Sequence, residues 1–149
     1  VVDAALERAE NTGAAAAAIE LPDGKILTGK TSNLLGPSAA LILNALKDLA
    51  GIDHNLHVIS PTAIEPIQKV KTQYLGSKNP RLHIDEILIA LSISSAANPA
   101  AQLAMEQLPK LKGCQVHTSV MLSSVDIKLF KKLGIQLTCE PKYEHNPIY

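Results

Sequence analysis

Aromatic residues are scarce in this sequence, and tryptophan is absent: Phe, Trp and Tyr together make up 3% of its 149 residues. We therefore expect no platform of aromatic rings on which nucleic-acid bases could stack. There is also no excess of either charge, because 14 basic residues balance 14 acidic ones. Without a global field to attract a polyanion or an anionic lipid surface, the composition predicts neither a nucleic-acid partner nor a membrane partner.

Long hydrophobic runs and targeting signals are missing as well. The apolar runs are far shorter than the roughly 20 residues that a membrane-spanning helix needs. No basic segment followed by an apolar stretch marks a signal peptide. The two cysteines, Cys114 and Cys139, are too few for a disulfide framework and are typical of thiols in a reducing compartment. These absences together predict a cytoplasmic protein.

Hydrophobic residues make up 46% of the chain, and their spacing predicts a single α/β domain over residues 1–141 with an irregular tail at 142–149. Gly and Pro residues mark where the elements end. The predicted helices are residues 1–10, 37–50, 61–74 (with a restart at Pro66), 84–97, 99–111 and 123–133. The predicted strands are residues 14–21, 25–30, 56–59, 114–122 and 135–139.

This order predicts how the sheet is built. Asp23-Gly24 is a hairpin-turn dipeptide, so the first two strands should pair antiparallel. The later strands are separated by helices, which favours parallel pairing with right-handed crossovers. We therefore expect a three-layer α/β/α sandwich around a mixed, mostly parallel sheet of about five strands.

Residues 24–31 read GKILTGKT, which satisfies the G-x-x-x-x-G-K-[ST] pattern of a phosphate-binding P-loop. A P-loop needs a glycine-rich loop that leads directly into a helix. Here the first glycine belongs to the hairpin turn, and residues 25–28 are typical of a strand. The pattern therefore does not predict P-loop NTPase activity. Lys30, Thr31 and Ser32 would instead lie at the end of a strand, where they either bind a small polar ligand or simply cap the strand.

A second polar segment, residues 76–86, contains the run KNPRLHIDE. Lys78 and Arg81 could bind a phosphate or a carboxylate, and arginine can do so through two parallel hydrogen bonds. His83 and Glu86 could complete such a site, with His83 as an acid or base. The alternative is a solvated loop whose acidic residues complement the dipole at the start of the next helix.

The sequence predicts no metal site and no cofactor. Cys114 and His117 form one C-x-x-H pair, but a structural zinc site needs four ligands and no second pair is evident. Ser38, Ser60 and Ser123 would each need a base to act as nucleophiles, and the sequence does not indicate one.

The order of elements resembles the cytidine deaminase fold. In that family, a His or Cys followed by x-Glu opens the second helix, and Pro-Cys-x-x-Cys opens the third, so that zinc lies between the two helix ends. The corresponding stretches here read GPSAA (36–40) and SPTAIE (60–65), with Thr62 and Glu65 where the cysteines would be expected. The resemblance is therefore one of topology, and zinc-dependent deamination is not expected.

In its residues, the chain resembles the C-terminal part of an uncharacterised bacterial family called domain of unknown function 1846, also known as uncharacterised protein family 0371. The stretches that carry the resemblance are TGKTSNLLG (28–36), LNALKDLAGI (43–52), ISPTAIEPIQ (59–68), LGSKNPRLHIDEILIALSIS (75–94), LPKLKGC (108–114) and FKKLGIQLTCEP (130–141). The resemblance implies that the sequence, which begins with Val1 rather than Met, is a fragment of a longer protein. It implies no activity.

Two functions therefore remain open. The first is a non-catalytic accessory domain that packs on the N-terminal part of its own full-length chain, or on a partner, and supports a homo-oligomer. The second is a domain that binds an anionic small molecule, for example a nucleotide, in a cleft between residues 28–33 and 76–86, with or without catalysis. The second hypothesis requires these two segments to meet in space around a pocket.

Overall fold

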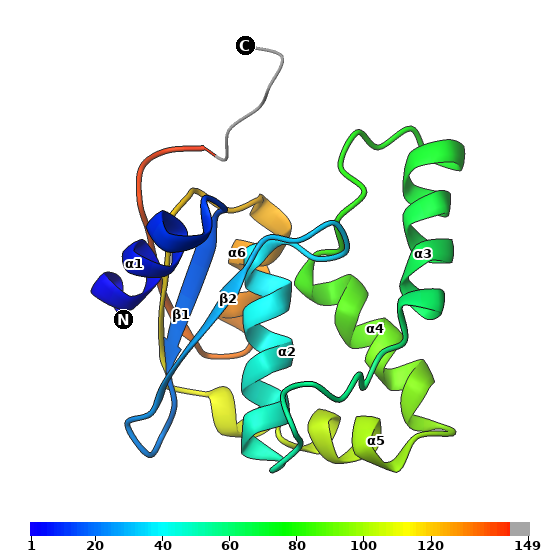
Figure 1. Ribbon diagram of the computed structural model, residues 1–149, viewed down its shortest axis with the longest axis horizontal. Helices are drawn as coiled ribbons and strands as arrows, with labels where there is room; N and C mark the ends of the chain where they lie inside the picture. The colour runs from blue at the N-terminus through cyan, green and yellow to red at the C-terminus, as the bar shows by residue number, and fades with distance from the viewer. Residues whose placement is uncertain (144–149) are drawn as a thin grey trace.

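A computed structural model describes residues 1–143 as an α/β fold (Figure 1). Its helices are α1 (Val2–Thr12), α2 (Pro37–Leu49), α3 (Pro61–Lys69), a π-helical turn η1 (Val70–Tyr74), α4 (Ile84–Ser95), α5 (Pro99–Glu106), a 3₁₀ turn η2 (Leu108–Leu111) and α6 (Ser124–Lys132). Its strands are β1 (Ala16–Glu20), β2 (Ile26–Lys30), β3 (Gln115–Thr118) and β4 (Gln136–Cys139). Within this part of the chain, no helix has both the length and the apolar character to cross a membrane.

Most helix ends lie where Gly and Pro residues predicted them. Helix α1 ends at Gly13, whose φ of 69° is a left-handed conformation that favours glycine. Pro37 occupies the first turn of α2, where its missing N–H costs no hydrogen bond. Ser123 caps α6 by accepting a hydrogen bond from the backbone N–H of Asp126, and the spacing of these two residues is that of an S-x-x-D capping motif.

The sheet is mixed, as expected, but it is not mostly parallel. Its strand order is β2-β1-β3-β4. β1 lies between β2 and β3 and runs antiparallel to both, and β3–β4 is the parallel pair. The prediction of a mostly parallel sheet failed because β3 does not pair with β2. It pairs with the other edge of β1, in the antiparallel direction. One consequence matters for function: β2, β3 and β4 all run in the same direction, so their carboxyl ends meet at one edge of the sheet.

The sheet of the described residues has four strands rather than about five. Residues 56–59, predicted as a strand, form no strand but an irregular, bent segment before α3. The apolar character of this segment has a different cause, because Val58 and Ile59 are buried against the core with exposed fractions of 2% and 3%. Tertiary burial of an irregular segment therefore produced the pattern that resembled a strand.

Two helix predictions also need correction. Pro66 does not restart a helix: α3 begins at Pro61, runs through Pro66 and continues into η1. Helix α5 ends at Glu106 instead of about Leu111, and a 3₁₀ turn containing Pro109 follows it. In both places the sequence located the helical segment correctly but not its internal break.

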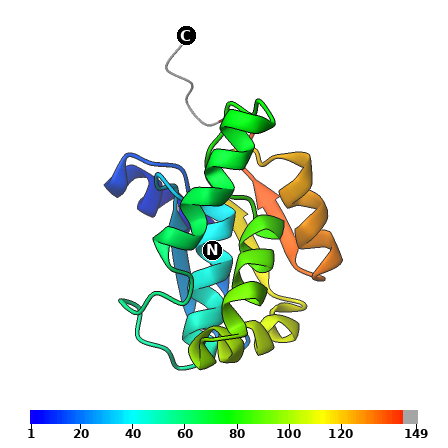
Figure 2. The same ribbon diagram turned by 90° about the vertical axis from the view of Figure 1, so that its right-hand side faces the viewer.

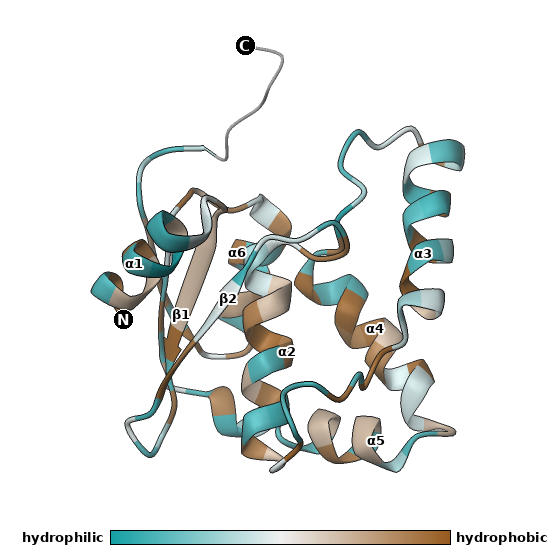
Figure 3. Cartoon of the chain, viewed as in Figure 1, coloured by the Kyte–Doolittle hydropathy of each residue, from teal (hydrophilic) through white to brown (hydrophobic). Residues whose placement is uncertain are grey.

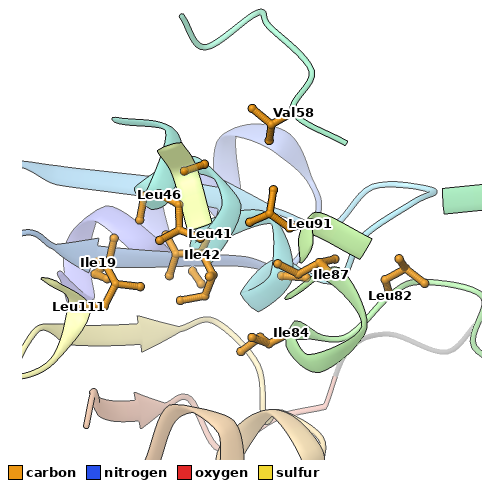
Figure 4. Close-up of a cluster of buried hydrophobic side chains, with 14 of the residues drawn as sticks. Ile19, Leu41, Ile42, Leu46, Val58, Leu82, Ile84, Ile87, Leu91 and Leu111 are labelled. Atoms are coloured by element: carbon orange, nitrogen blue, oxygen red, sulfur yellow. The ribbon is translucent and has the colours of Figure 1, made fainter. Parts of the chain in front are cut away.

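Helices cover both faces of the sheet. On one face α1 packs against β1, β2 and β3, while α2 packs against β1 and β2 and α6 against β4 (Figure 1). The main core lies between β1 and helices α2 and α4, where Ile19, Leu41, Ile42 and Ile87 are fully buried (Figure 4). All four residues Ala16 to Ile19 of β1 are buried, as expected for a strand that lies under helices on both sides.

Helix α3 and η1 form an arm that extends beyond the rest of the fold, green in Figure 2. Ile64 and Lys71 are its buried side chains. Polar bonds also hold the arm in place, because Gln68 Nε2 donates to Asn33 O at 2.8 Å and Lys71 Nζ donates to Arg81 O at 2.6 Å. These bonds tie the arm to both of the polar segments that the sequence singled out. Most of the predicted tail, residues 144–149, lies outside the described residues.

Candidate functional site

The two polar segments meet in space. Arg81 Nε donates a hydrogen bond to Ser32 O at 2.7 Å, and Leu82 N donates to Leu34 O at 2.9 Å. Leu35 and Leu82 also form an isolated parallel β-bridge, with Gly36 N donating to Leu82 O at 3.2 Å. The segments after β2 and before α4 therefore lie side by side, as the ligand-binding hypothesis requires.

An open cleft of about 890 Å³ lies at this contact. It is found where the carboxyl ends of the three co-directional strands meet: Lys30–Asn33 follow β2, Ser119 and Val120 follow β3, and Lys142 and Tyr143 follow β4. Arg81 and the end of α1 complete the lining. Crevices outside the carboxyl ends of strands are where open α/β sheets usually bind ligands. Of the seven predicted site residues, the cleft brings together Lys30, Thr31, Ser32 and Arg81.

Among the described residues, the cationic groups of the cleft have no acidic partners. Within residues 1–143, neither Lys30 nor Lys142 takes part in an ion pair, and the hydrogen bond of the Arg81 side chain is the one to Ser32 O. Since that bond uses Nε, the terminal nitrogens of the guanidinium remain available to an anion. Glu10 is the carboxylate that lines the same cleft. Three cations against one carboxylate give the cleft an excess of positive charge.

Thr31 adds a buried polar atom to the same lining. The residue is 6% exposed, and its backbone N–H donates to Ala15 O at 2.8 Å. Its side-chain Oγ1 has no hydrogen-bond partner among the described residues. Buried hydroxyl groups are nearly always hydrogen-bonded in folded proteins, so an unpartnered one needs a reason. The residue lines the cleft, but Oγ1 itself has almost no exposed surface, so a ligand reaches this donor only if the side chain turns toward the cleft.

His83 and Glu86 form a separate cluster with Lys71. Glu86 Oε1 accepts hydrogen bonds from Lys71 Nζ at 2.8 Å and from the backbone N–H of His83 at 2.8 Å, and it lies 3.1 Å from His83 Nδ1. Burial alone would raise the pKa of Glu86, but the His83 N–H and the Lys71 ammonium outweigh it and lower that pKa. The cluster caps the start of α4 and secures the arm, and its charges compensate one another internally.

The chain offers one group of possible metal ligands in its described part, namely His83, Asp85 and Glu86. Their ligand atoms lie within 4.8 Å of one another. However, the Asp85 carboxylate accepts from the backbone N–H of Glu86 at 2.9 Å, and Glu86 Oε1 already serves Lys71. A cation would have to displace that ammonium. This competition favours the role of the cluster as a helix cap.

Three residues that the sequence did not single out matter here: Ser119, Lys142 and Lys71. Lys142 follows a predicted strand, so the direction of β4 would have indicated it had the topology been known. Ser119 lay inside the predicted strand 114–122, and it follows β3 because that strand ends at Thr118. Lys71 lies inside a predicted helix and carries no such signal. Conversely, Lys78 is exposed and makes no hydrogen bond or ion pair in residues 1–143, and it does not line the cleft.

Both glycines of the GKILTGKT pattern have structural roles. Gly24 adopts a φ of 86° in the turn between β1 and β2. Gly29 lies in β2 under α2, where an added Cβ would come within 2.6 Å of Leu41 Cα and 2.9 Å of Ala40 C. The strand and the helix can therefore approach this closely because position 29 has no side chain. The pattern arises from a hairpin turn and a strand–helix contact, and α2 begins only at Pro37.

The two residues of the C-x-x-H pair, Cys114 and His117, are engaged in the fold. His117 is 4% exposed, with Nδ1 2.6 Å from Thr138 Oγ1 and Nε2 2.8 Å from Glu140 Oε2. Cys114 is buried beside Lys110 O, and burial raises the pKa of its thiol. The C-x-x-H pair thus contributes one residue to the β3–β4 pairing and one to the core.

Comparison with known proteins identifies the family. Residues 1–149 match the model described as "Domain of unknown function DUF1846, C-terminal", and the chain belongs to this family. It is 56% identical over its whole length to a UPF0371 protein of Corynebacterium glutamicum and 58% identical to one of Corynebacterium efficiens. It is also 49% identical over its whole length to a UPF0371 protein of Streptococcus pyogenes. The chain spans about 30% of the length of each of these relatives.

Proposed function

We propose that this domain binds an anionic small molecule in the cleft between residues 28–33 and 76–86. The observation that carries the proposal is the convergence of Lys30, Arg81 and Lys142, without ion-pair partners in the described residues, at the carboxyl ends of three strands. The ligand-binding hypothesis, which the sequence left as the alternative, comes first because the two polar segments are in contact.

The cleft supports recognition of a phosphate or a carboxylate. A guanidinium whose Nε is fixed by Ser32 O is oriented before the ligand arrives, so less side-chain entropy is lost on binding. Lys30 and Lys142 add positive charge to the same lining. No histidine or cysteine is among the described residues that line the cleft. This lining favours binding over acid–base chemistry.

A thermal-shift screen of the chain tests the proposal, with inorganic phosphate, pyrophosphate, ATP and citrate as probes. A ligand at a hundredfold excess over its dissociation constant stabilises the folded state by about 2.7 kcal/mol. We expect at least one probe to raise the midpoint, and Lys30→Ala and Arg81→Ala to reduce the stabilisation by about half or more, as a tenfold weaker affinity implies. Lys131→Ala on α6, which packs on the opposite edge strand, removes one positive charge and is the matched control. Equal shifts in all variants would refute the proposal.

A second function, a domain that packs on the rest of its own chain, is favoured by a different observation. Ile89 and Ile93, one turn apart on α4, are 60% and 71% exposed. At the end of the arm, Tyr74 and Leu75 are 70% and 75% exposed. The apolar character of α4 is visible in Figure 3. Exposed apolar side chains of this size are typical of interaction surfaces. The chain spans about 30% of the length of its relative from Corynebacterium glutamicum, and the rest of such a protein is a candidate for the partner that covers this surface.

This second function has its own test. Ile89→Glu and Ile93→Glu place charges on the exposed side of α4, where they cost the isolated domain little stability. If the N-terminal part of the full-length protein, or a second copy, packs on this helix, the variants lose co-purification with that part or sediment as monomers where the parent chain does not. Unchanged association and unchanged sedimentation would exclude α4 as the interface.

Three finer predictions from the sequence accompany these proposals. A homo-oligomer and a cytoplasmic location both remain to be tested, the first by sedimentation and the second by fractionation of cells. The cytidine-deaminase-like topology likewise stays a prediction. It implies no zinc here, since Thr62 and Glu65 stand at the positions of the family's cysteines.

A further inference from the structure

The outer edge of β2 presents backbone groups that the sheet does not use. Leu21 N donates to Lys25 O and Thr31 N donates to Ala15 O, both at 2.8 Å, so the odd-numbered residues of this hairpin strand bond to β1. In an antiparallel pair the residues in between direct their N–H and C=O groups away from the partner strand. For β2 these residues are Ile26, Thr28 and Lys30.

A side chain confirms the direction of these groups. Asn44 Nδ2 donates to Thr28 O at 3.0 Å, which places that carbonyl on the outer edge. Apart from this bond, the outward N–H and C=O groups of Ile26, Thr28 and Lys30 have no partner within residues 1–143. An edge of this kind is a template for pairing with another extended chain.

A groove of about 620 Å³ runs along this edge. Its lining includes Arg8 of α1, Ile26 and Thr28 of β2, and Asn44 and Lys47 of α2. At a rise of about 3.3 Å per residue, the five residues of β2 offer about 16 Å of edge, enough for an added strand of about five residues. Ile26 is 46% exposed and supplies apolar contact for such a strand.

The charges of the groove favour an acidic occupant. Arg8 and Lys30 line it, and the carboxylate among its lining residues, Asp48, is held by Lys25 at 2.6 Å. A further lining cation, Lys47, is buried and donates to His54 O at 2.6 Å, so it adds to the positive field without being free to pair. Lys30 and Ser32 line both this groove and the anion cleft, so the two hollows adjoin at the end of β2. A chain that follows the edge of β2 therefore reaches the cations of the cleft.

We propose that the outer edge of β2 receives an extended peptide segment of another protein, with acidic side chains, as an additional strand of the sheet. Main-chain hydrogen bonds to Ile26, Thr28 and Lys30 supply affinity, and a carboxylate of the segment lies at Lys30. This inference rests on the proposed function in that it uses the same cations of the cleft, and it assigns to them a carboxylate of a peptide in place of a free small molecule.

A titration of the ¹⁵N-labelled chain with a designed octapeptide tests the inference. The peptide alternates valine and threonine, carries two glutamates near its carboxyl end, and is acetylated and amidated so that its charge comes from side chains alone. We expect the amide signals of Ile26, Thr28 and Lys30 to shift. A peptide with glutamines in place of the glutamates should bind at least tenfold more weakly.

Two kinds of variant separate strand addition from simple charge attraction. Thr28→Pro removes an outward N–H without touching the β1–β2 hydrogen bonds, whereas Thr28→Val keeps that N–H and removes the hydroxyl. We expect the first to abolish binding and the second to retain it. If Thr28→Pro fails to fold, N-methylation of alternate residues of the peptide gives the same test: one alternate set should abolish binding and the other should not.

Each outcome has a consequence. Shifts with inorganic phosphate but with no peptide would leave the anion cleft standing and refute strand addition. Equal affinity for the glutamate and glutamine peptides would refute the acidic occupant of this edge, while the thermal-shift screen with small anions would still decide the role of Lys30 in the cleft. Binding unchanged by Thr28→Pro and by both patterns of N-methylation would show that the peptide binds elsewhere. No response to any peptide at millimolar concentration would also overturn the inference.

Discussion

Lys30 and Lys71 belong to neighbouring segments, yet their ammonium groups are used in opposite ways. Lys71 is buried and donates to Arg81 O at 2.6 Å and to Glu86 Oε1 at 2.8 Å. Lys30 is exposed and makes no ion pair within the described residues. Arg81 joins the two regions: its carbonyl receives Lys71, and its guanidinium lines the cleft beside Lys30.

The difference separates what the fold requires from what it leaves free. A buried charge must be compensated, because an unpaired one costs several kcal/mol. In the cluster of Lys71, His83 and Glu86 the charges compensate one another. Folding alone is therefore a sufficient reason for these three residues to be there. An exposed lysine has no such requirement, and the fold gains little from it. The cations of the cleft are therefore the ones whose presence calls for a ligand.

The largest expected effect concerns Gly29, the residue that brings β2 and α2 together beside Lys30. In Gly29→Ala the new Cβ meets the backbone of Leu41 and Ala40, which cannot move aside as a flexible side chain could. We expect a loss of at least about 3 kcal/mol in the free energy of unfolding. Urea denaturation measures this loss.

Gly24→Ala is the matched control for this prediction. Gly24 has a φ of 86°, but nothing lies within 4 Å of an added Cβ. We expect a loss of about 1 kcal/mol, from the backbone conformation alone. If Gly29→Ala cost no more than Gly24→Ala, the contact between β2 and α2 would not explain the glycine in GKT.

The second prediction breaks the compensated cluster. In Lys71→Met the Glu86 carboxylate loses its cationic partner, and Arg81 O loses a donor. The Glu86 side chain is 23% exposed. We therefore expect a loss of about 2 kcal/mol in the free energy of unfolding, which is less than the cost of breaking a fully buried pair. Urea denaturation at neutral pH measures it. An unchanged midpoint would mean that the arm is not secured by this lysine.

The third prediction uses pH to sharpen the same contrast. The pKa of Glu86 is lowered in the folded state relative to its ordinary value of 4.5. Its contribution to stability is therefore complete above pH 4.5 and is lost as the pH falls through the folded-state pKa. Lys71→Met should weaken this loss of stability at acid pH, and denaturation at pH 3 to 6 measures it.

Asp126 must be controlled in this experiment because it acts with the opposite sign. Burial raises the pKa of Asp126, although the backbone N–H of Ile84 opposes the rise. Its contribution is thus largest below the ordinary value of 3.8 and falls as the pH rises through the folded-state pKa. Asp126→Asn keeps the oxygen that accepts from Ile84 and removes this titration. If the acid dependence did not differ between Asp126→Asn and its Lys71→Met double variant, Lys71 would not set the pKa of Glu86.

The sequence revealed the elements better than their arrangement. Pro37 and Gly13 are local signals, and the helix ends that they predicted are confirmed. The position of β3 is not a local property: nothing in residues 115–118 tells whether they join β1 or β2. Residues 56–59 show the same limit, since burial of Val58 mimics the pattern of a strand.

The candidate site shows a similar division. Residue type and polarity were enough to select the segments around Lys30 and Arg81, because both segments combine cations with hydroxyl or amide groups beside predicted element ends. Lys142 could not be selected this way, because its place in the cleft depends on β4 running in the same direction as β2. His83 and Glu86 were selected for their chemistry, but Lys71, a distant residue in another helix, determines what they do.

The smallest expected effect on stability is the most informative about function. Lys30→Ala should change the free energy of unfolding by less than about 0.5 kcal/mol, because the side chain is exposed and has no partner within residues 1–143 to lose. Arg81→Ala should cost about 1 kcal/mol, since it removes the bond to Ser32 O.

Lys30→Ala and Arg81→Ala should both weaken the binding of an anion by about tenfold or more, as expected when a charged hydrogen bond is lost. Lys78→Ala, on the same loop as Arg81 but outside the cleft, should change neither quantity. Isothermal titration and urea denaturation of these three variants would separate the roles. If Lys78→Ala weakened binding as much as Lys30→Ala, the attraction would come from the general charge of the loop rather than from the cleft.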